Sequence, residues 1–142
     1  MIRTKSKPDS LSTLIKKLDT VFSEFIRLRD CDDKGTVTCF VTGERVWWRD
    51  SDAAHYIHRA AMTTRYDQMN VHATTKDTNQ FEDPFQHEKK YREKMVSTYG
   101  LSTVTQLEQR GRELQKFMRH EILELIETYS EKVKQLKKQK GL

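Results

Sequence analysis

The sequence predicts an α+β domain in which a small β-hairpin core lies between an N-terminal helix and a long C-terminal helical region. Two observations predict this class. Apolar residues recur at helical spacing near both ends of the chain, and a segment rich in β-branched and aromatic residues separates them. The 142 residues are enough for one domain and little more. We expect a single domain with a helix over 10–29, a core over 30–85 and a helical region over 86–142.

The composition narrows the class of protein further. Hydrophobic residues make up 35% of the chain and charged residues 33%. No apolar run approaches the roughly 20 residues that span a bilayer, so we expect no membrane segment. The net charge of +5 is compatible with a polyanionic partner. Cys31 and Cys39 are too few for a disulfide framework, and residues 1–9 lead into no apolar secretory segment, so we expect a cytoplasmic location.

The N-terminal segment has a strong helical pattern. Ser10 or Asp9 can act as its N-cap by accepting hydrogen bonds from the first-turn N–H groups. Apolar residues recur at intervals of three and four from Leu11 to Ile26, which places them on one packing face. The face opposite the apolar residues carries Lys16, Lys17, Asp19 and Glu24.

A hairpin is predicted in the first half of the core. Residues 36–41 are β-branched and aromatic, which is typical of a strand, residues 42–44 form a turn, and residues 45–48 return. For Trp47 and Trp48, core packing or strand pairing is favoured over stacking on an unpaired DNA base.

Metal-capable side chains crowd the segment after the hairpin. They are His55, His58, His72, Asp50, Asp52, Asp67, Asp77, Asn70 and Asn79. Asp52 and Asn79 can give oxygen ligands to a hard divalent ion, and a neutral His55 beside it can take a proton from water. Arg59 and Arg65 can hold a phosphate as its charge develops. This set forms a coherent phosphodiesterase site, and the alternative of packed or hydrogen-bonded histidines stays open.

The last part is predicted to be helical in two pieces. One helix runs from residue 84 to 99 and stops at Gly100, and a long last helix starts at Ser102 or Thr103 with a bend at Gly111. The apolar face of the last helix can pack on the first helix or on a second subunit. Its lysine-rich end is either a solvated terminus favoured by the helix dipole or a phosphate contact.

Three phrases carry a resemblance to a known family. Residues 22–30 (FSEFIRLRD), 52–59 (DAAHYIHR) and 64–72 (TRYDQMNVH) resemble the NinG (Rap) family of phage recombination nucleases. The similarity continues into the final helix and covers about residues 10 to 130. The resemblance implies a ββα-metal core of the HNH and endonuclease VII type. It also implies a metal-dependent endonuclease that cuts branched DNA such as Holliday junctions and D-loops.

The resemblance implies roles for four residues. His55 would be the general base, at the end of the first strand of the ββα unit. Asn70 would brace the loop by hydrogen bonds and orient that base. Asp52 and Asn79 would bind Mg²⁺ or Mn²⁺. Many HNH enzymes place a ligand immediately before the histidine, but that position is Ala54, which cannot bind a metal.

Substrate and partners follow from charge and geometry. The residues expected to contact DNA are Arg59, Arg65, Lys76, Lys134, Lys137 and Lys138. A junction has no unique sequence, so we expect recognition of phosphates and shape. Two cuts are needed to resolve a junction, which favours a homodimer with the first and last helices as its surfaces. Other phage recombination proteins are candidate partners, and a phage protein would act in the host cytoplasm.

The sequence departs from the family pattern at its cysteines. The family has two Cys-x-x-Cys pairs that form a structural zinc site. The matching segments are 39–42 (CFVT) and 75–78 (TKDT), so three of four thiolates are missing and we expect no structural zinc. Packing of Trp47, Trp48 and the flanking helices is expected to compensate. Ala54 replaces a family glycine and would be strained if that position needs a positive φ.

These departures leave three functions open. The first is a nuclease, which the retained His55, Asn70 and Asn79 favour. In the second, the fold is a catalytically inactive DNA-binding or protein-interaction module. In the third, the protein is a purely structural partner of other phage proteins.

Overall fold

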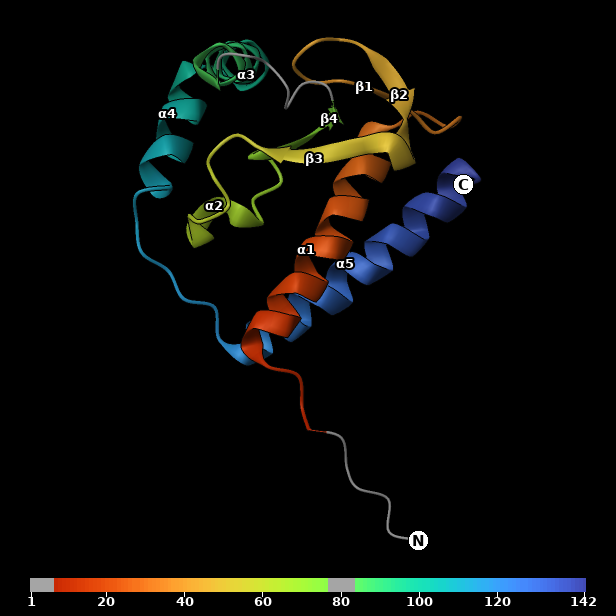
Figure 1. Cartoon of the computed structure of the whole chain (residues 1–142), viewed down its shortest axis with the longest axis vertical. Helices are drawn as coiled ribbons and strands as arrows, with labels where there is room; N and C mark the ends of the chain where they lie inside the picture. Colours follow the sequence, from red (N-terminus) through yellow and green to blue (C-terminus); the bar gives the residue numbers. More distant parts are fainter. Residues whose placement is uncertain (1–6, 77–83) are drawn as a thin grey trace, which may run out of the picture.

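The computed structural model describes residues 7–76 and 84–142, and its fold is α+β, as predicted (Figure 1). In chain order the elements are α1 (Leu11–Asp30), β1 (Thr36–Thr38), β2 (Arg45–Trp47), a short 3₁₀ helix (Trp48–Asp50), β3 (Ser51–His55), α2 (Met62–Arg65), β4 (Val71–Thr75), α3 (Pro84–Tyr99), α4 (Leu101–Arg110) and α5 (Arg119–Lys140). Within the described ranges, no helix has the length and apolar character needed to cross a membrane.

Helix α1 confirms the prediction of an N-terminal amphipathic helix. The Ser10 side chain is the N-cap and accepts a hydrogen bond from the backbone N–H of Thr13 at 3.2 Å. The buried face consists of Leu14, Leu18, Phe22, Phe25, Ile26 and Leu28. At the other end, the Lys140 ammonium of α5 donates to the Leu28 carbonyl at 2.7 Å, so a cation satisfies the negative end of the α1 dipole.

The strands form two antiparallel pairs. β1 pairs with β2, with Val37 opposite Val46, which confirms the predicted hairpin. β1 is shorter than predicted, because the Phe40 N–H leaves this pair and donates to the Ala73 carbonyl of β4 at 3.1 Å. β3 pairs with β4, with His55 opposite Val71. Since side chains alternate along a strand, the β3–β4 pair presents two different faces.

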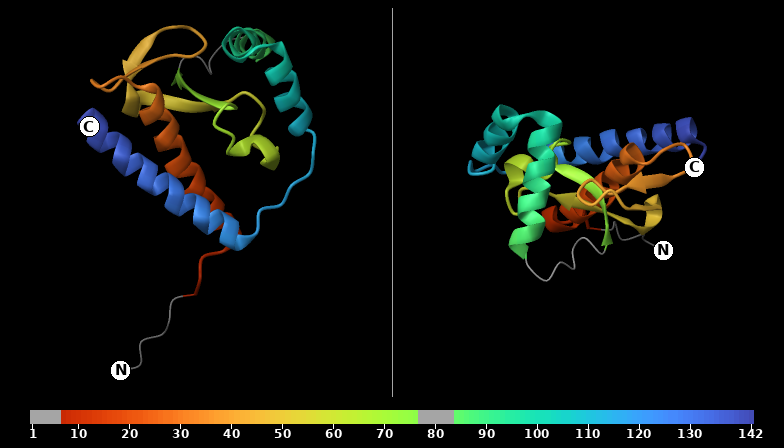
Figure 2. Two further views of the ribbon diagram at one scale, coloured as in Figure 1. Left: turned by 180° about the vertical axis from the view of Figure 1, so that it is seen from behind. Right: turned by 90° about the horizontal axis from the view of Figure 1, so that it is seen from above.

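Each face of the β3–β4 pair packs against a different set of helices (Figure 2). The larger apolar cluster joins one face to α1 and α5, and its β3–β4 members are Ala53, Val71 and Ala73. The smaller cluster joins the other face to α3 and α4, and Ala54 is its β3 member. Ala54 therefore lies inside a covered strand, and none of the described non-glycine residues has a positive φ. The replacement of the family glycine by Ala54 causes no strain of that kind.

Helices α1 and α5 lie side by side and run in the same direction (Figures 1 and 2). Near their starts, the Arg119 guanidinium donates to the Asp9 carbonyl at 2.6 Å. Near their ends, the Lys137 ammonium lies 2.7 Å from the Glu24 carboxylate. The apolar faces that we expected to form dimer surfaces are therefore buried against each other within one chain.

The prediction of a single bent last helix is wrong. Helix α4 ends at Arg110, residues 111–113 turn the chain, residues 114–118 belong to no helix or strand, and α5 begins at Arg119. The division has a packing reason, because Leu107 of α4 belongs to the smaller cluster whereas Ile122 of α5 belongs to the larger one. One continuous helix would not reach both clusters, so the connecting segment crosses the outside of the fold (Figure 1).

The two tryptophans of the hairpin have different environments. Trp48 is buried in the larger cluster, which confirms core packing for this residue. Trp47 is partly exposed and its ring covers Gly35, where an added Cβ would lie 2.1 Å from the ring. Gly35 also has a φ of +81°, so both the Trp47 ring and the backbone conformation disfavour a side chain at this position. Cys31 and Cys39 are both buried and are not joined in a disulfide.

Phe22 offers a test of the larger cluster. It is 2% exposed and makes edge-to-face contacts with Tyr66 and Tyr129. Replacing Phe22 with alanine is expected to lower the free energy of unfolding by about 3–5 kcal/mol, because a cavity remains in a packed core. Urea denaturation measures this change. The control is Phe85→Ala, since Phe85 is 80% exposed; equal losses for the two variants would contradict this packing.

Candidate functional site

His55 stands at the end of β3, where the family resemblance expects the general base. Its ring lines a pocket of about 260 Å³ between α1, β3 and the loop that follows β3. The other residues that line this pocket are Asp19, Phe22, Ser23, Ala53 and Arg59. His55, the Asp19 carboxylate and Arg59 thus line the same pocket.

A single hydrogen bond fixes the protonation pattern of His55. Its Nε2 lies 2.9 Å from the backbone carbonyl oxygen of Arg65. A carbonyl oxygen can only accept, so Nε2 carries the hydrogen. In the neutral ring the lone pair is then on Nδ1, which has no hydrogen-bond partner among the described residues. His55, which lines the pocket, therefore keeps a proton-accepting nitrogen.

The surroundings of His55 favour its neutral form. Burial lowers the pKa of His55, and the positive charges of Arg65 and Arg59 lower it further. The bond to the Arg65 carbonyl and the negative charge of Asp19 act in the opposite direction, and the net change is downward. Because the unperturbed value is about 6.5, the ring is neutral at pH 7 and able to accept a proton.

Asn70 braces the loop that joins β3 to β4. Its side-chain oxygen accepts from the Ile57 N–H at 2.8 Å, and its amide nitrogen donates to the carbonyls of Ile57 and Thr64, each at 3.1 Å. Its backbone carbonyl also accepts from the Tyr56 N–H at 2.8 Å. Asn70 is fully buried and joins both ends of the loop that carries Arg65. In this way it helps to place the carbonyl that binds His55.

The same loop is fastened to α4. The Thr63 hydroxyl donates to the Arg110 carbonyl at 2.7 Å, and the Arg110 guanidinium forms an ion pair with Asp67 at 2.5 Å. The loop between β3 and β4 is thus held by the Asn70 side chain within it and by Arg110 at the end of α4.

Asp19 is the main residue of this site that the sequence did not predict. We expected it on the face of the first helix opposite the apolar residues, but it lines a pocket together with Phe22. The Asp19 carboxylate lies in the pocket and accepts from Arg65 Nε at 3.0 Å and Nη2 at 2.5 Å. It also accepts from the Tyr66 hydroxyl at 2.8 Å. The available signal was its place in the row Ile15, Asp19, Phe22 and Ile26, which helical spacing puts along one side of α1.

The two predicted phosphate-binding arginines differ in the exposure of their side chains to solvent. The Arg65 side chain is 14% exposed and its guanidinium is committed to Asp19. Arg59 is exposed at the pocket. Arg59 is therefore better placed than Arg65 to contact a phosphate that approaches His55.

Of the two proposed metal ligands, only Asp52 is among the described residues, and it does not lie beside His55. Asp52 is three residues before His55 on β3, which is roughly 10 Å along a strand, and it does not line the pocket. Asn79 lies outside the described residues. Among residues 7–76 and 84–142, no three His, Cys, Asp or Glu side chains gather as a metal site.

The predicted basic contacts are also divided. Lys76, Lys134 and Lys138 are exposed. Lys137, by contrast, pairs with Glu24 at 2.7 Å. Part of the lysine-rich end of α5 therefore holds this helix to α1.

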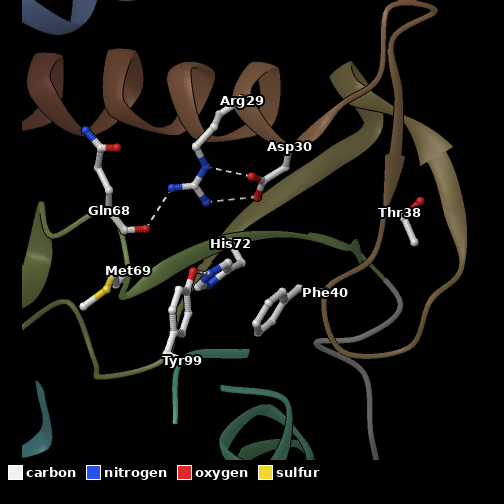
Figure 3. Close-up of a pocket in the computed structure, with 8 residues that line it drawn as sticks. All are labelled: Arg29, Asp30, Thr38, Phe40, Gln68, Met69, His72 and Tyr99. Carbon is white, nitrogen blue, oxygen red and sulfur yellow. Dashed lines mark hydrogen bonds and ion pairs between the residues drawn. The ribbon is translucent and has the colours of Figure 1, made fainter. Parts of the chain in front are cut away.

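A second, larger pocket of about 450 Å³ is lined by Arg29 and Asp30 at the end of α1 and by Phe40, His72 and Tyr99 (Figure 3). Arg29 forms an ion pair with Asp30 at 2.7 Å and donates to the carbonyls of Gln68 and Val71, each at 2.8 Å. Asp30 also accepts from the Ala73 N–H at 2.8 Å. These groups cross-link the end of α1 to β4, so their hydrogen-bonding capacity serves the fold.

His72 in this second pocket is a structural histidine. Its ring stacks on Phe40 with the ring centroids 3.8 Å apart. Tyr91 donates its hydroxyl hydrogen to the Ala54 carbonyl at 2.6 Å, so its oxygen accepts from His72 Nδ1 at 3.1 Å. His72 Nε2 then accepts from the Tyr99 hydroxyl at 2.6 Å. Burial lowers the pKa of His72 to about 4, and both ring nitrogens are used within the fold.

Comparison with known proteins identifies one family. A family model named NinG and described as the bacteriophage lambda NinG protein matches residues 2–139. No curated protein and no solved structure matches the chain. The family match agrees with the resemblance of the segments around His55 and Asn70, and it covers nearly the full sequence.

The neutral His72 gives a prediction for the pH dependence of stability. Its pKa is depressed in the folded state, so the unfolded chain binds a proton first as pH falls below about 6.5. This stability is present above that pH and is lost as pH falls towards 4, by about 2–3 kcal/mol.

Urea denaturation at pH 7 and pH 4.5 measures this loss. The variant His72→Gln is expected to lose less free energy of unfolding over this range than the wild type. The control is His120→Gln, because His120 is exposed and the change should leave the pH dependence as in the wild type. An identical pH dependence in wild type and His72→Gln would contradict a neutral His72.

Proposed function

We propose, because the chain belongs to the bacteriophage lambda NinG family, that it is a DNA endonuclease that cuts branched recombination intermediates. The substrates are Holliday junctions and D-loops, and the reaction is metal-dependent hydrolysis of a phosphodiester. The observation that carries this proposal is the neutral His55, which lines a pocket and has Nε2–H bound to the Arg65 carbonyl, so that Nδ1 is left as the proton acceptor.

The proposed chemistry begins with a proton transfer to His55. Nδ1 takes a proton from a water molecule whose oxygen attacks the phosphorus. A new P–O bond forms, the P–O bond to the leaving sugar oxygen breaks, and that oxygen is protonated by solvent. The exposed Arg59 is placed to attract the phosphate as negative charge develops.

The metal requirement rests on the family resemblance. A bound Mg²⁺ or Mn²⁺ would supply Lewis-acid stabilisation of the developing charge. Asp52 and Asn79 remain the proposed ligands, although Asp52 lies away from His55 on β3. The proton transfer to His55 depends on its own hydrogen bond and burial, whichever groups hold the ion.

The proposed substrate fits the charge of the chain. A net charge of +5 favours a polyanionic partner, and the protein would recognise such DNA through its phosphates and its shape. The exposed Lys76, Lys134 and Lys138 are the remaining proposed contacts. Two cuts across a junction call for two sites, so we propose a homodimer. Other phage recombination proteins are proposed as further partners.

The second candidate is a DNA-binding or protein-interaction module without catalysis. Two observations favour it. Asp52 does not line the pocket beside His55, and threonine stands in place of cysteine at positions 42, 75 and 78. Such a module would bind a junction through its basic residues without cutting it.

A cleavage assay separates the two candidates. Purified protein is incubated with a labelled four-way junction, with and without Mg²⁺ or Mn²⁺. We expect metal-dependent cutting that falls by about 10²–10⁴-fold in His55→Ala, because the general base is lost. The matched control is His58→Ala, since His58 lies three residues away and its Nδ1 only accepts from the Ala60 N–H.

Cleavage by wild type and His58→Ala, but not by His55→Ala, supports the nuclease. Binding without cleavage in all three proteins, with the same affinity, would favour the inactive module. Neither binding nor cleavage would favour a structural partner protein.

A further inference from the structure

We propose that Asp19, on α1, is a positioning residue for His55 and acts through Arg65. This proposal rests on the proposed function, because it concerns the same histidine. It extends the site beyond the β3–β4 pair and makes the N-terminal helix part of it.

A continuous path of contacts connects Asp19 to the base. The Asp19 carboxylate receives two hydrogen bonds from the Arg65 guanidinium, at 3.0 and 2.5 Å. The backbone carbonyl of the same Arg65 accepts from His55 Nε2 at 2.9 Å. Movement of Arg65 relative to α1 would therefore move the group that selects the tautomer of His55.

The ion pair between Asp19 and Arg65 is shielded enough to hold this geometry. The two side chains are 28% and 14% exposed, and two parallel N–H···O bonds define the plane of the pair. The Tyr66 hydroxyl adds a third bond to the carboxylate at 2.8 Å. Arg65 also donates through Nη1 to the Arg59 carbonyl at 3.1 Å, so the pair holds the pocket wall that carries Arg59.

Packing explains why a carboxylate reaches the site from α1. Phe22, one turn after Asp19, is buried in the larger cluster and lines the same pocket. That contact fixes the rotation of α1 against β3 and turns Asp19 towards His55. A solvent-face aspartate would have no such constraint.

The charges around His55 come from three elements. Asp19 faces it from α1, Arg65 from the end of α2, and Arg59 from the loop before α2. Asp19 raises the pKa of His55, and the two arginines lower it. Loss of the Asp19 charge would leave Arg65 unpaired beside the ring, so protonation of His55 would become harder.

Opposite shifts are expected when either member of the ion pair is neutralised. The midpoint of His55 protonation is followed by NMR in the resting protein, without DNA or metal. In Asp19→Asn we expect the midpoint to fall by about half a pH unit or more. In Arg65→Gln we expect it to rise, because the repelling charge is gone and Asp19 is uncompensated. The Arg65→Gln variant also keeps a readout if Asp19→Asn does not fold.

A control separates this link from general loosening of the fold. Glu24→Gln removes another ion pair of α1, the one with Lys137, away from the pocket. This variant is expected to leave the midpoint of His55 within about 0.2 pH units of the wild type, because it does not change the charge at the ring.

The proposal is overturned if neither variant of the pair moves the midpoint, if both move it in the same direction, or if Glu24→Gln moves it as far as Asp19→Asn. Because the readout is the ring in the resting protein, it does not depend on nuclease activity. If the protein also cuts junctions, Asp19→Asn should reduce the rate by about 10–100-fold and shift the acid limb of the pH–rate profile downward.

Discussion

The hydrogen bond from His55 to the Arg65 carbonyl joins the end of β3 to the loop before β4, and the proposed chemistry depends on it. It selects the tautomer of the ring and leaves Nδ1 as the proton acceptor. Two further constraints help to place that carbonyl. The Asn70 amide closes the loop from within, and the Asp19 carboxylate holds the Arg65 side chain from α1. A helix, a loop and a strand thus position one nitrogen.

The two covered faces of the β3–β4 pair explain why two histidines of one segment have different roles. His55 lies on the face towards α1 and lines a pocket that also contains the Asp19 carboxylate and Arg59. His72 lies on the face towards α3, where Tyr91 and Tyr99 use both of its ring nitrogens. Buried hydrogen bonds of this kind stabilise a fold and leave no nitrogen for chemistry. Because side chains alternate along paired strands, two histidines from neighbouring parts of the sequence therefore point to opposite faces.

Local signals made part of this structure predictable. The N-cap and apolar spacing of α1, and the β-branched hairpin, are encoded within a few residues of each element. The division after Arg110 was not predictable from spacing, because it depends on which apolar cluster each helix meets. His55 was predicted at the end of a strand. Asp19 was instead placed on the face of the first helix opposite the apolar residues, because local spacing does not show how tertiary packing rotates α1 against the strands. The Asn70 network likewise depends on the path of the loop between the strands.

The tautomer of His55 tests the central claim most directly. The nitrogen-15 shifts of a ring labelled in the folded protein distinguish a protonated from an unprotonated nitrogen at pH 7. The geometry predicts a neutral ring with hydrogen on Nε2 and a lone pair on Nδ1. A neutral ring with hydrogen on Nδ1, or a doubly protonated ring at this pH, would contradict it and remove the proposed base.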